Sequence, residues 1–229
     1  MLNQEVKDIL SSSADAGWVM EPEAKRLLRI TGINVPDFIW VKDRSEIESS
    51  ASEIGFPLVA KVVSDRIIHK SDSNGVVIGI DNPKSLEETF DRFSKFEGFS
   101  GMLVEETLSG IELIIGAKVD YQFGPVILFG IGGTGVEIYR DTTLRMAPLN
   151  RDDVDSMVKC LKAHKLLQGY RGSDPIDMMG LTNLMIKFSE LAMGLENVMD
   201  SIDLNPVMCA PERCVVADAR IMLKSKENK

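Results

Sequence analysis

A short segment that is apolar on both faces apart from one lysine limits what this sequence can fold into. It covers residues 58–63, follows Pro57, and predicts a strand with Lys61 in its middle. A buried ammonium group is costly unless it meets an anion or a carboxylate. Two interpretations stay open: Lys61 is a phosphate ligand, or its aliphatic stem packs while its head reaches solvent or a partner group.

Helices and strands on either side of this segment predict a first α+β lobe. We expect a helix over 21–32, because Pro22 suits a first helical turn and Gly32 suits a C-terminal stop. The remaining elements expected in this lobe are strands at 38–41 and 76–80 and helices at 45–54 and 83–96.

A second α+β lobe is expected to begin near Gly98. Its clearest feature is a hairpin, with strands at 111–119 and 125–129 joined by the loop 120–124. Further β structure is expected at 102–106, 136–140, 142–146, 201–205 and 215–218, and amphipathic helices at 152–167 and 181–199. The predicted division is an N-terminal extension (1–20), a small lobe (21–97), a large lobe (98–223) and a polar tail (224–229).

The charge balance excludes one class of partner. The 229 residues include 26 Lys and Arg against 35 Asp and Glu, a formal net charge of −9, whereas general nucleic-acid binding needs a basic face. No apolar run approaches the roughly 18 residues that cross a bilayer, so no membrane partner is expected. The first residues show no signal-peptide pattern, and we therefore expect a cytoplasmic protein.

The three cysteines point the same way. Cys160, Cys209 and Cys214 are odd in number and none belongs to a Cys-x-x-Cys pair. We therefore expect idle or buried thiols, and neither a disulfide framework nor a zinc site.

Two loops are candidates for phosphate chemistry. His69 begins the polar loop 69–75, where Asn74 and Gly75 can supply positive φ angles, and an imidazole can accept and pass on a phosphoryl group. A lone histidine is more often only a surface or turn residue, so that interpretation stays open. The run 130–135 matches Gly-x-Gly-x-x-Gly, but a strand-like segment follows it instead of a helix, which argues against a dinucleotide site there. A flexible glycine turn over a ligand stays open.

Acidic side chains gather at strand ends. Glu105, Glu106 and Glu112 could accept hydrogen bonds from an amino group and from sugar hydroxyls. Asp203 and Asn205 share one face of a strand, and with Asp218 they offer oxygen ligands that suit Mg²⁺ held against phosphates. The alternative is that these are ordinary surface carboxylates.

Six segments occur in an order that resembles the ATP-grasp fold, and more closely the β subunit of ADP-forming acyl-CoA (acetyl-CoA) synthetases, relatives of succinyl-CoA synthetase. The resemblance runs from about residue 21 to residue 223. The segments that carry it are 57–61, 68–72, 104–116, 123–133, 141–148 and 203–206. It implies a two-lobed α+β fold in which the lobes hold ATP or ADP between them.

The resemblance also implies roles for single residues. Lys61 would contact the nucleotide phosphates, Glu105 and Glu106 would face the adenine, and Glu112 would bind the ribose. His69 would be the phosphohistidine that passes phosphate to ADP, and Arg145 could stabilise the transferred phosphoryl group. Asn205 and Asp218 would hold Mg²⁺, with Asp203 assisting. The family's loop usually has two glycines where this chain has Asn74-Gly75, and asparagine tolerates the left-handed region that such a loop needs.

The reaction implied is acyl-CoA + ADP + phosphate giving acid + CoA + ATP, catalysed only together with an α subunit. That subunit would carry the CoA-binding domain and the first phosphohistidine, in an α2β2 heterotetramer. Two alternatives stay open: a stand-alone ATP-grasp carboxylate–amine ligase, in which His69 is incidental, and a nucleotide-sensing subunit without turnover.

Overall fold

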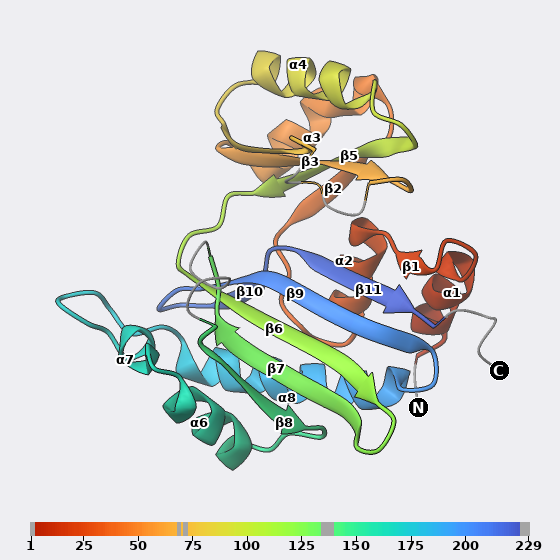
Figure 1. The fold of residues 1–229 in the computed structure, drawn as a ribbon. Coiled ribbons are helices and arrows are strands. Elements are labelled where there is room, and N and C mark those ends of the chain that lie inside the picture. Colours follow the sequence, from red (N-terminus) through yellow and green to blue (C-terminus); the bar gives the residue numbers. More distant parts are fainter. Residues whose placement is uncertain (1–2, 68–69, 71–72, 134–139, 225–229) are drawn as a thin grey trace. The chain divides into compact units, whose positions relative to one another are not determined.

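The computed structural model describes residues 3–67, 70, 73–133 and 140–224, in two compact units. Unit 2 comprises residues 36–108, and unit 1 comprises 1–35 together with 109–229 (Figure 1). No helix in the described ranges is long and apolar enough to cross a membrane.

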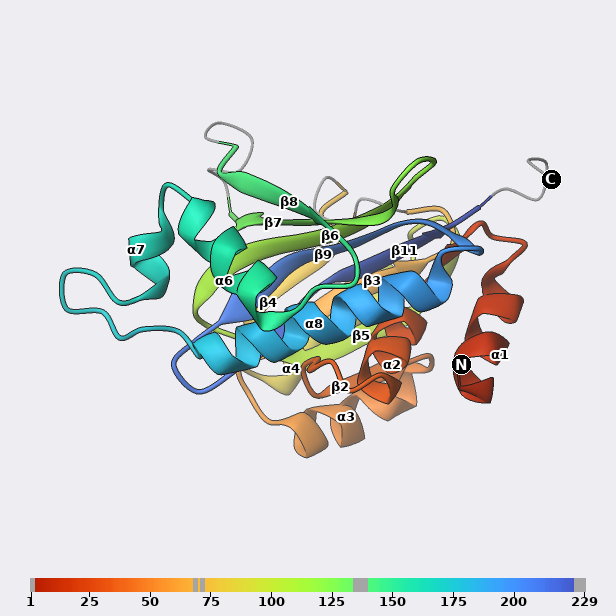
Figure 2. The same cartoon turned by 90° about the horizontal axis from the view of Figure 1, so that it is seen from below.

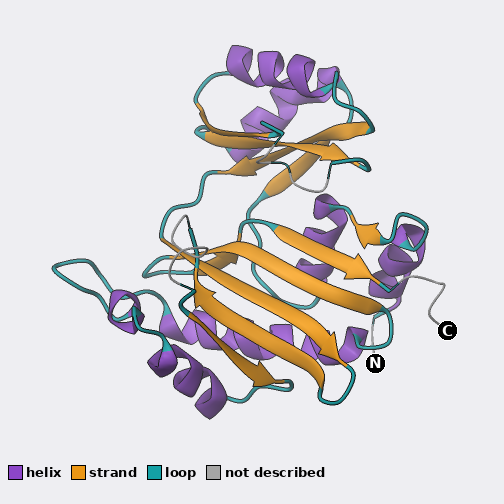
Figure 3. Ribbon diagram, in the orientation of Figure 1, coloured by secondary structure: helices purple, strands orange, loops and turns teal. Residues whose placement is uncertain are grey.

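Unit 2 is a four-stranded antiparallel sheet with helices on one face (Figure 3). Its strand order is β2-β5-β3-β4, and Val41, Leu58, Val62, Val104 and Phe93 are among its buried residues. The elements are β2 (Phe38–Val41), η1 (Arg44–Glu46), α3 (Ile47–Ile54), β3 (Leu58–Ser64), β4 (Val76–Ile80), α4 (Pro83–Phe93) and β5 (Phe99–Glu106). The lysine-bearing segment is therefore β3, an inner strand.

Unit 1 is built on a seven-stranded sheet in the order β1-β11-β9-β6-β7-β8, with β10 paired to β9. Its strands are β1 (Trp18–Val19), β6 (Ile111–Asp120), β7 (Gly124–Ile131), β8 (Thr142–Met146), β9 (Met199–Cys209), β10 (Cys214–Val216) and β11 (Ala219–Leu223). Its helices are α1 (Gln4–Ser13), α2 (Glu21–Ile30), α6 (Arg151–Cys160), α7 (His164–Leu167) and α8 (Met178–Leu195). Helix α8 runs along one face of this sheet, and Phe188 and Leu195 are buried there (Figure 2).

The boundaries of the two units differ from those of the lobes predicted from the sequence. Strand β5 pairs with β2 and β3 and so belongs to unit 2, although the boundary was expected near Gly98. Helix α2 belongs to unit 1, as does the expected N-terminal extension, whose helix α1 buries Val6 and Ile9 in the unit 1 core. Of the predicted tail, only Lys224 lies within the described residues.

The predicted helix over 152–167 is two helices, α6 and α7. An Asn150–Asp153 capping box starts α6, and Leu161 is extended, with ψ at 136°. Beyond it, the Asp141 carboxylate accepts hydrogen bonds from the backbone nitrogens of Lys162 and Ala163 at 2.8 and 2.9 Å. Those two amides therefore point at Asp141 instead of continuing the hydrogen bonds of α6.

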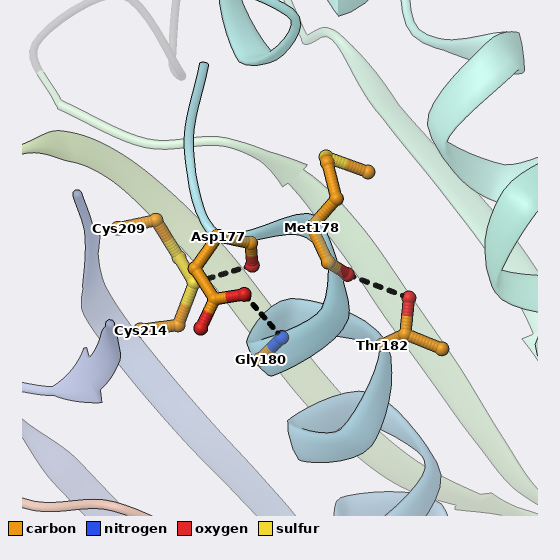
Figure 4. The surroundings of a disulfide bond; sticks show 6 residues. All are labelled: Asp177, Met178, Gly180, Thr182, Cys209 and Cys214. Atoms are coloured by element: carbon orange, nitrogen blue, oxygen red, sulfur yellow. Dashed lines mark hydrogen bonds between the residues drawn. A yellow bond between two sulfur atoms is a disulfide. The ribbon is translucent and has the colours of Figure 1, made fainter. Parts of the chain in front are cut away.

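The cysteine prediction was wrong for two of the three residues. Cys209 and Cys214 are joined in a disulfide that spans the β9–β10 hairpin (Figure 4), and only Cys160 is a free, exposed cysteine. The odd count concealed this pair, because the spacing of the two cysteines is set by a hairpin and not by a Cys-x-x-Cys motif.

Candidate functional site

Lys61 of unit 2 is paired with a carboxylate. It lies in the middle of β3, where 6% of the residue is exposed, and its Nζ is 3.0 Å from Oε2 of Glu105 on β5, which is 2% exposed. The ammonium group of Lys61 therefore reaches a partner group and not solvent. The interpretation of Lys61 as a phosphate ligand stays open. A phosphate at this point would share the lysine with Glu105.

Glu105 and Glu106 do not act as a pair. They are successive residues of β5 and their side chains point to opposite faces of the sheet. Glu106 is only half-buried, and its Oε1 accepts a hydrogen bond from the backbone nitrogen of Asp37 at 3.2 Å. The backbone of Glu106 in turn donates to the Asp37 carbonyl oxygen at 3.1 Å, so Glu106 anchors the segment that leads into β2.

The histidine of the polar loop, His69, lies outside the described residues. The end of that loop is described: Asn74 has a φ angle of 54°, in the left-handed region, as the sequence predicted, whereas Gly75 lies outside that region. Gly75 closes the turn, since its backbone nitrogen donates to the Lys70 carbonyl oxygen at 2.7 Å and its carbonyl oxygen accepts from Val62 at 2.8 Å. The loop is thus tied back to β3 close to Lys61.

Two glycines, Gly132 and Gly133, lie beside Glu112 of unit 1. Glu112 is the second residue of β6, and its carbonyl oxygen accepts a hydrogen bond from the Gly132 backbone nitrogen at 2.6 Å. Gly133 has a φ angle of 78°, and a Cβ atom there would lie 3.0 Å from Oε2 of Glu112. These glycines of the Gly-x-Gly-x-x-Gly run therefore provide room for a side chain, a role that the motif did not indicate. The predicted strand over 136–140 lies almost entirely outside the described residues.

Asp203 and Asn205 lie on β9 and face away from α8. Leu204 between them is fully buried in the core, and side chains alternate along a strand. Asp218 immediately precedes β11, and its carbonyl oxygen accepts a hydrogen bond from the Asn205 backbone nitrogen at 3.2 Å. The sheet thus places two of the predicted metal ligands on β9 and the third next to the start of the neighbouring strand β11.

Arg220 is a partner of this group that the sequence analysis missed. It is the register partner of Asp203 across β9 and β11, and its Nη2 lies 3.2 Å from Oδ2 of Asp203. The sequence offers no local signal for this pairing, because it depends on β9 and β11 becoming neighbours in the sheet. One oxygen of Asp203 therefore lies against a guanidinium group, whereas the predicted metal ligands Asn205 and Asp218 have no such cation among the contacts of the described residues.

Asp203 also borders a hollow of about 410 Å³ on the sheet face opposite α8. The charged residues around this hollow are Lys118, Asp120 and Asp203. Its apolar lining includes Ile114, Val126, Leu128, Leu144 and Ile202. A small ligand can therefore reach this face of unit 1 beside the predicted metal ligands.

Arg145 is not brought to these residues. It lies on β8 opposite Ile127, which is buried in the core on the α8 side of the sheet. Its Nη2 donates to Oγ of Ser156 on α6 at 2.8 Å, and its Nη1 donates to the Leu144 carbonyl oxygen at 2.9 Å. Arg145 therefore ties β8 to α6 on the face of the sheet opposite Asp203 and Asn205.

Comparison with known proteins shows the family of this chain. A family model described as the ATP-grasp domain matches residues 11–223. The β subunit of acetate–CoA ligase [ADP-forming] I from Pyrococcus furiosus is 37% identical over 223 residues, which cover 94% of this chain and 96% of that subunit.

Solved structures give the same picture. The dinucleotide-forming acetyl-coenzyme A synthetase 1 of Ca. Korarchaeum cryptofilum, in complex with coenzyme A, Ca-AMPCP and HgCl⁺, has a TM-score of 0.90 and 36% identity, covering 95% of this chain and 99% of that chain. A structure of the same protein with coenzyme A and Mg-AMPPCP has a TM-score of 0.85 and 35% identity, covering 96% and 100% of the two chains. In that complex a phosphohistidine segment points towards the nucleotide-binding site.

Proposed function

Because this chain belongs to the ATP-grasp family, and within it to the β subunits of ADP-forming acetate–CoA ligases, we propose that it is the nucleotide-binding β subunit of an ADP-forming acyl-CoA synthetase. The reaction is acyl-CoA + ADP + phosphate giving acid + CoA + ATP, in either direction. The enzyme is thus an acid–thiol ligase.

The observation that carries this proposal is a match in length as well as in sequence. The relative named as a β subunit aligns over 96% of its length with 94% of this chain, so the alignment covers nearly all of both. The match includes the elements that hold Lys61, Glu112 and Asn205.

Each unit, taken by itself, offers residues for the proposed nucleotide contacts. In unit 2, Lys61 would contact the phosphates, and the paired Glu105 would hold the ammonium group in a fixed place while the charge on the phosphates changes. Glu106 would lie near the adenine. In unit 1, Glu112 would accept hydrogen bonds from the ribose hydroxyls, and the glycines beside it leave its carboxylate room to do so.

The oxygen donors of unit 1 fit a magnesium ion. Mg²⁺ binds oxygen ligands and keeps several waters, so one or two carboxylates with the phosphates of a nucleotide are sufficient. Asn205 and Asp218 would hold it, and Asp203, whose carboxylate contacts Arg220, would assist. Among the described residues no group of three or more His, Cys, Asp or Glu offers a competing metal site. When bound, the ion would neutralise charge on the phosphates.

His69 would carry the phosphoryl group. Its ring nitrogen forms a P–N bond as the phosphoryl leaves its donor, and that bond breaks when a terminal phosphate oxygen of ADP takes the phosphoryl group to give ATP. A long transfer is thereby divided into two short ones, and the solved relative with a phosphohistidine segment supports this assignment.

The other half of the reaction needs a second polypeptide. We propose an α subunit with the CoA-binding domain and a first phosphohistidine, assembled as α2β2, because the matched relative is itself named as one subunit of a ligase. The chain alone is expected to bind nucleotide without making acyl-CoA. Full synthetase activity of the purified chain alone would contradict this part of the proposal.

Phosphorylation with labelled ATP and Mg²⁺ tests the assignment of His69. The wild type should take up label that is stable in base and lost in acid, and His69→Ala should take up none. His164→Ala is the matched control, since the only other histidine lies on α7 with its Nδ1 2.8 Å from the Leu161 carbonyl oxygen. Equal labelling of His69→Ala and wild type would show that His69 is not the acceptor.

A further inference from the structure

The β9–β10 hairpin places two cysteines directly opposite each other. Cys209 is the last residue of β9 and Cys214 is the first residue of β10, and they are register partners with Cα atoms 4.2 Å apart. The turn between them contains Pro211 and Glu212, both exposed. The bond therefore closes a loop of only a few residues.

Contacts other than the disulfide also fix the register of this hairpin. The backbone nitrogen of Ala210 donates to the Arg213 carbonyl oxygen at 2.9 Å, next to the cysteine pair. Val216 pairs with Val207, and both are fully buried in the unit 1 core. These contacts hold the two thiols side by side when they are reduced, so bond formation has a small entropic cost.

The reduced state also has a hydrogen-bond partner. The Sγ atom of Cys214 lies 3.6 Å from the carbonyl oxygen of Asp177, in the segment that caps α8 (Figure 4). A thiol can donate to this oxygen, whereas a disulfide sulfur has no proton to donate. Asp177 is itself fixed, because its backbone nitrogen donates to the Ala210 carbonyl oxygen at 2.8 Å and its Oδ1 accepts from Gly180 at 2.8 Å. Both chemical states of the pair are thus accommodated by the same surroundings.

We propose that Cys209 and Cys214 form a reversible redox-modification site that exchanges with small thiols and disulfides. One thiolate attacks a small disulfide RSSR, forming a mixed disulfide and releasing one RS⁻. The second thiolate then attacks the protein sulfur of that mixed disulfide and releases the other RS⁻. Two electrons pass from the protein to RSSR, and two RSH are formed once protons are taken up.

The disulfide restrains local opening of the hairpin, and the same opening is needed before a small thiol can reach the two sulfur atoms. Cys209 is 0% and Cys214 is 1% exposed, so a small thiol reaches them only when the hairpin opens locally. The free Cys160 is exposed and would react without such opening, so it is replaced by serine in the test. The hairpin also borders β6, where Met208 is the register partner of Glu112.

The test is thiol counting on the full chain carrying Cys160→Ser. The protein is equilibrated with mixtures of reduced and oxidised glutathione, quenched in acid, unfolded and alkylated, and its mass is measured. We expect two alkylated cysteines at the reducing end, none at the oxidising end, and the same curve from either starting state. Two alkylated cysteines at every ratio, or none at every ratio including excess thiol, would overturn the proposal.

Amide hydrogen exchange gives a second measurement that needs no nucleotide. Exchange of the turn 210–213 should be several-fold faster in the reduced protein than in the oxidised one, and the Cys209→Ser/Cys214→Ser double variant should match the reduced protein. Equal exchange in both states would show that the bond does not control the hairpin.

Discussion

At the scale of single residues, variants of the buried pair Lys61–Glu105 allow its effect on stability to be measured apart from its effect on nucleotide binding. Two buried charges are costly to desolvate, and removing one of them leaves the other uncompensated, at about 3–5 kcal/mol. Glu105→Met alone should therefore reduce the free energy of unfolding by that order, and Lys61→Met/Glu105→Met should recover most of the loss. Denaturant unfolding of the two variants measures this.

The same variants separate a structural lysine from a nucleotide ligand. Lys61→Met/Glu105→Met should remain folded but bind ADP at least tenfold more weakly, because the cation near the phosphates is gone. Lys84→Ala is the control in the same unit, since its side chain is exposed on α4. Unchanged ADP affinity in the double variant would mean that Lys61 serves the fold alone.

Asp43 is expected to make the stability of the folded protein slightly pH-dependent, in a direction that follows from its lowered pKa. The Ser45 hydroxyl and backbone nitrogen both donate to its Oδ1, at 2.6 and 2.9 Å, and hold the pKa of Asp43 below its ordinary value of 3.8. A carboxylate whose pKa is lowered by folding stabilises the protein above its unfolded pKa, and this contribution is lost as the pH falls through the folded pKa. From about pH 6 to about pH 3, the wild type should therefore lose slightly more stability than Asp43→Asn. Parallel pH profiles would contradict the assignment.

The sequence predicted residue types better than residue surroundings. The lysine in β3 and the left-handed Asn74 follow from local rules, and the structure has both. The partner of Lys61 and the pairing of Asp203 with Arg220 depend on which strands become neighbours, and a single sequence does not state this. Arg145 was linked to phosphoryl transfer by family resemblance, and the parity of β8 places it on the other sheet face.

At the scale of elements, the turn after β7 positions Glu112. Gly133→Ala should destabilise unit 1 by about 1–2 kcal/mol, because alanine is strained at positive φ and its Cβ would press on the Glu112 carboxylate. It should also weaken nucleotide binding. Gly17→Ala is the matched control, with a φ angle of 75° and no atom within 4 Å of the added Cβ, so it should cost stability without affecting binding. Equal ADP affinities in both variants would rule out this role of the turn.

Long, periodic elements were predicted well and short ones were not. Strands β6 and β7 and their hairpin match the expectation closely, since alternation and turn residues are local signals. Strand β1 has two residues and β11 has five, and neither was expected, because such short strands are defined by their pairing, β1 with β11 and β11 with β9. The break between α6 and α7 depends on Asp141, a residue ten positions before the start of α6.

At the scale of the whole molecule, a formal net charge of −9 leaves few positive groups for an anionic ligand. Charge neutralisation by Lys61 and a bound Mg²⁺ is therefore expected to dominate nucleotide affinity. Removal of Mg²⁺ with a chelator should lower ADP affinity at least tenfold, and Asn205→Ala/Asp218→Ala should make affinity insensitive to the chelator. Calorimetric titration measures both, and Mg²⁺-dependent binding that survives in the double variant would place the ion elsewhere.

The division of the molecule is the part that sequence order could not reveal. Unit 1 is discontinuous, since residues 1–35 join a sheet whose other strands lie beyond residue 109. A boundary drawn along the chain therefore assigned β5 and α2 to the wrong units. The family resemblance is independent of such boundaries, and the full-length match to a β subunit agrees with it.

The most direct test of the account is isotope exchange between labelled ADP and ATP in the purified chain, without acyl-CoA, CoA or a second subunit. A β subunit that forms a phosphohistidine should catalyse this exchange in the presence of Mg²⁺. His164→Ala should keep the activity and His69→Ala should lose it. No exchange in the wild type, despite measurable ADP binding, or exchange that persists in His69→Ala, would contradict the proposed phosphoryl relay.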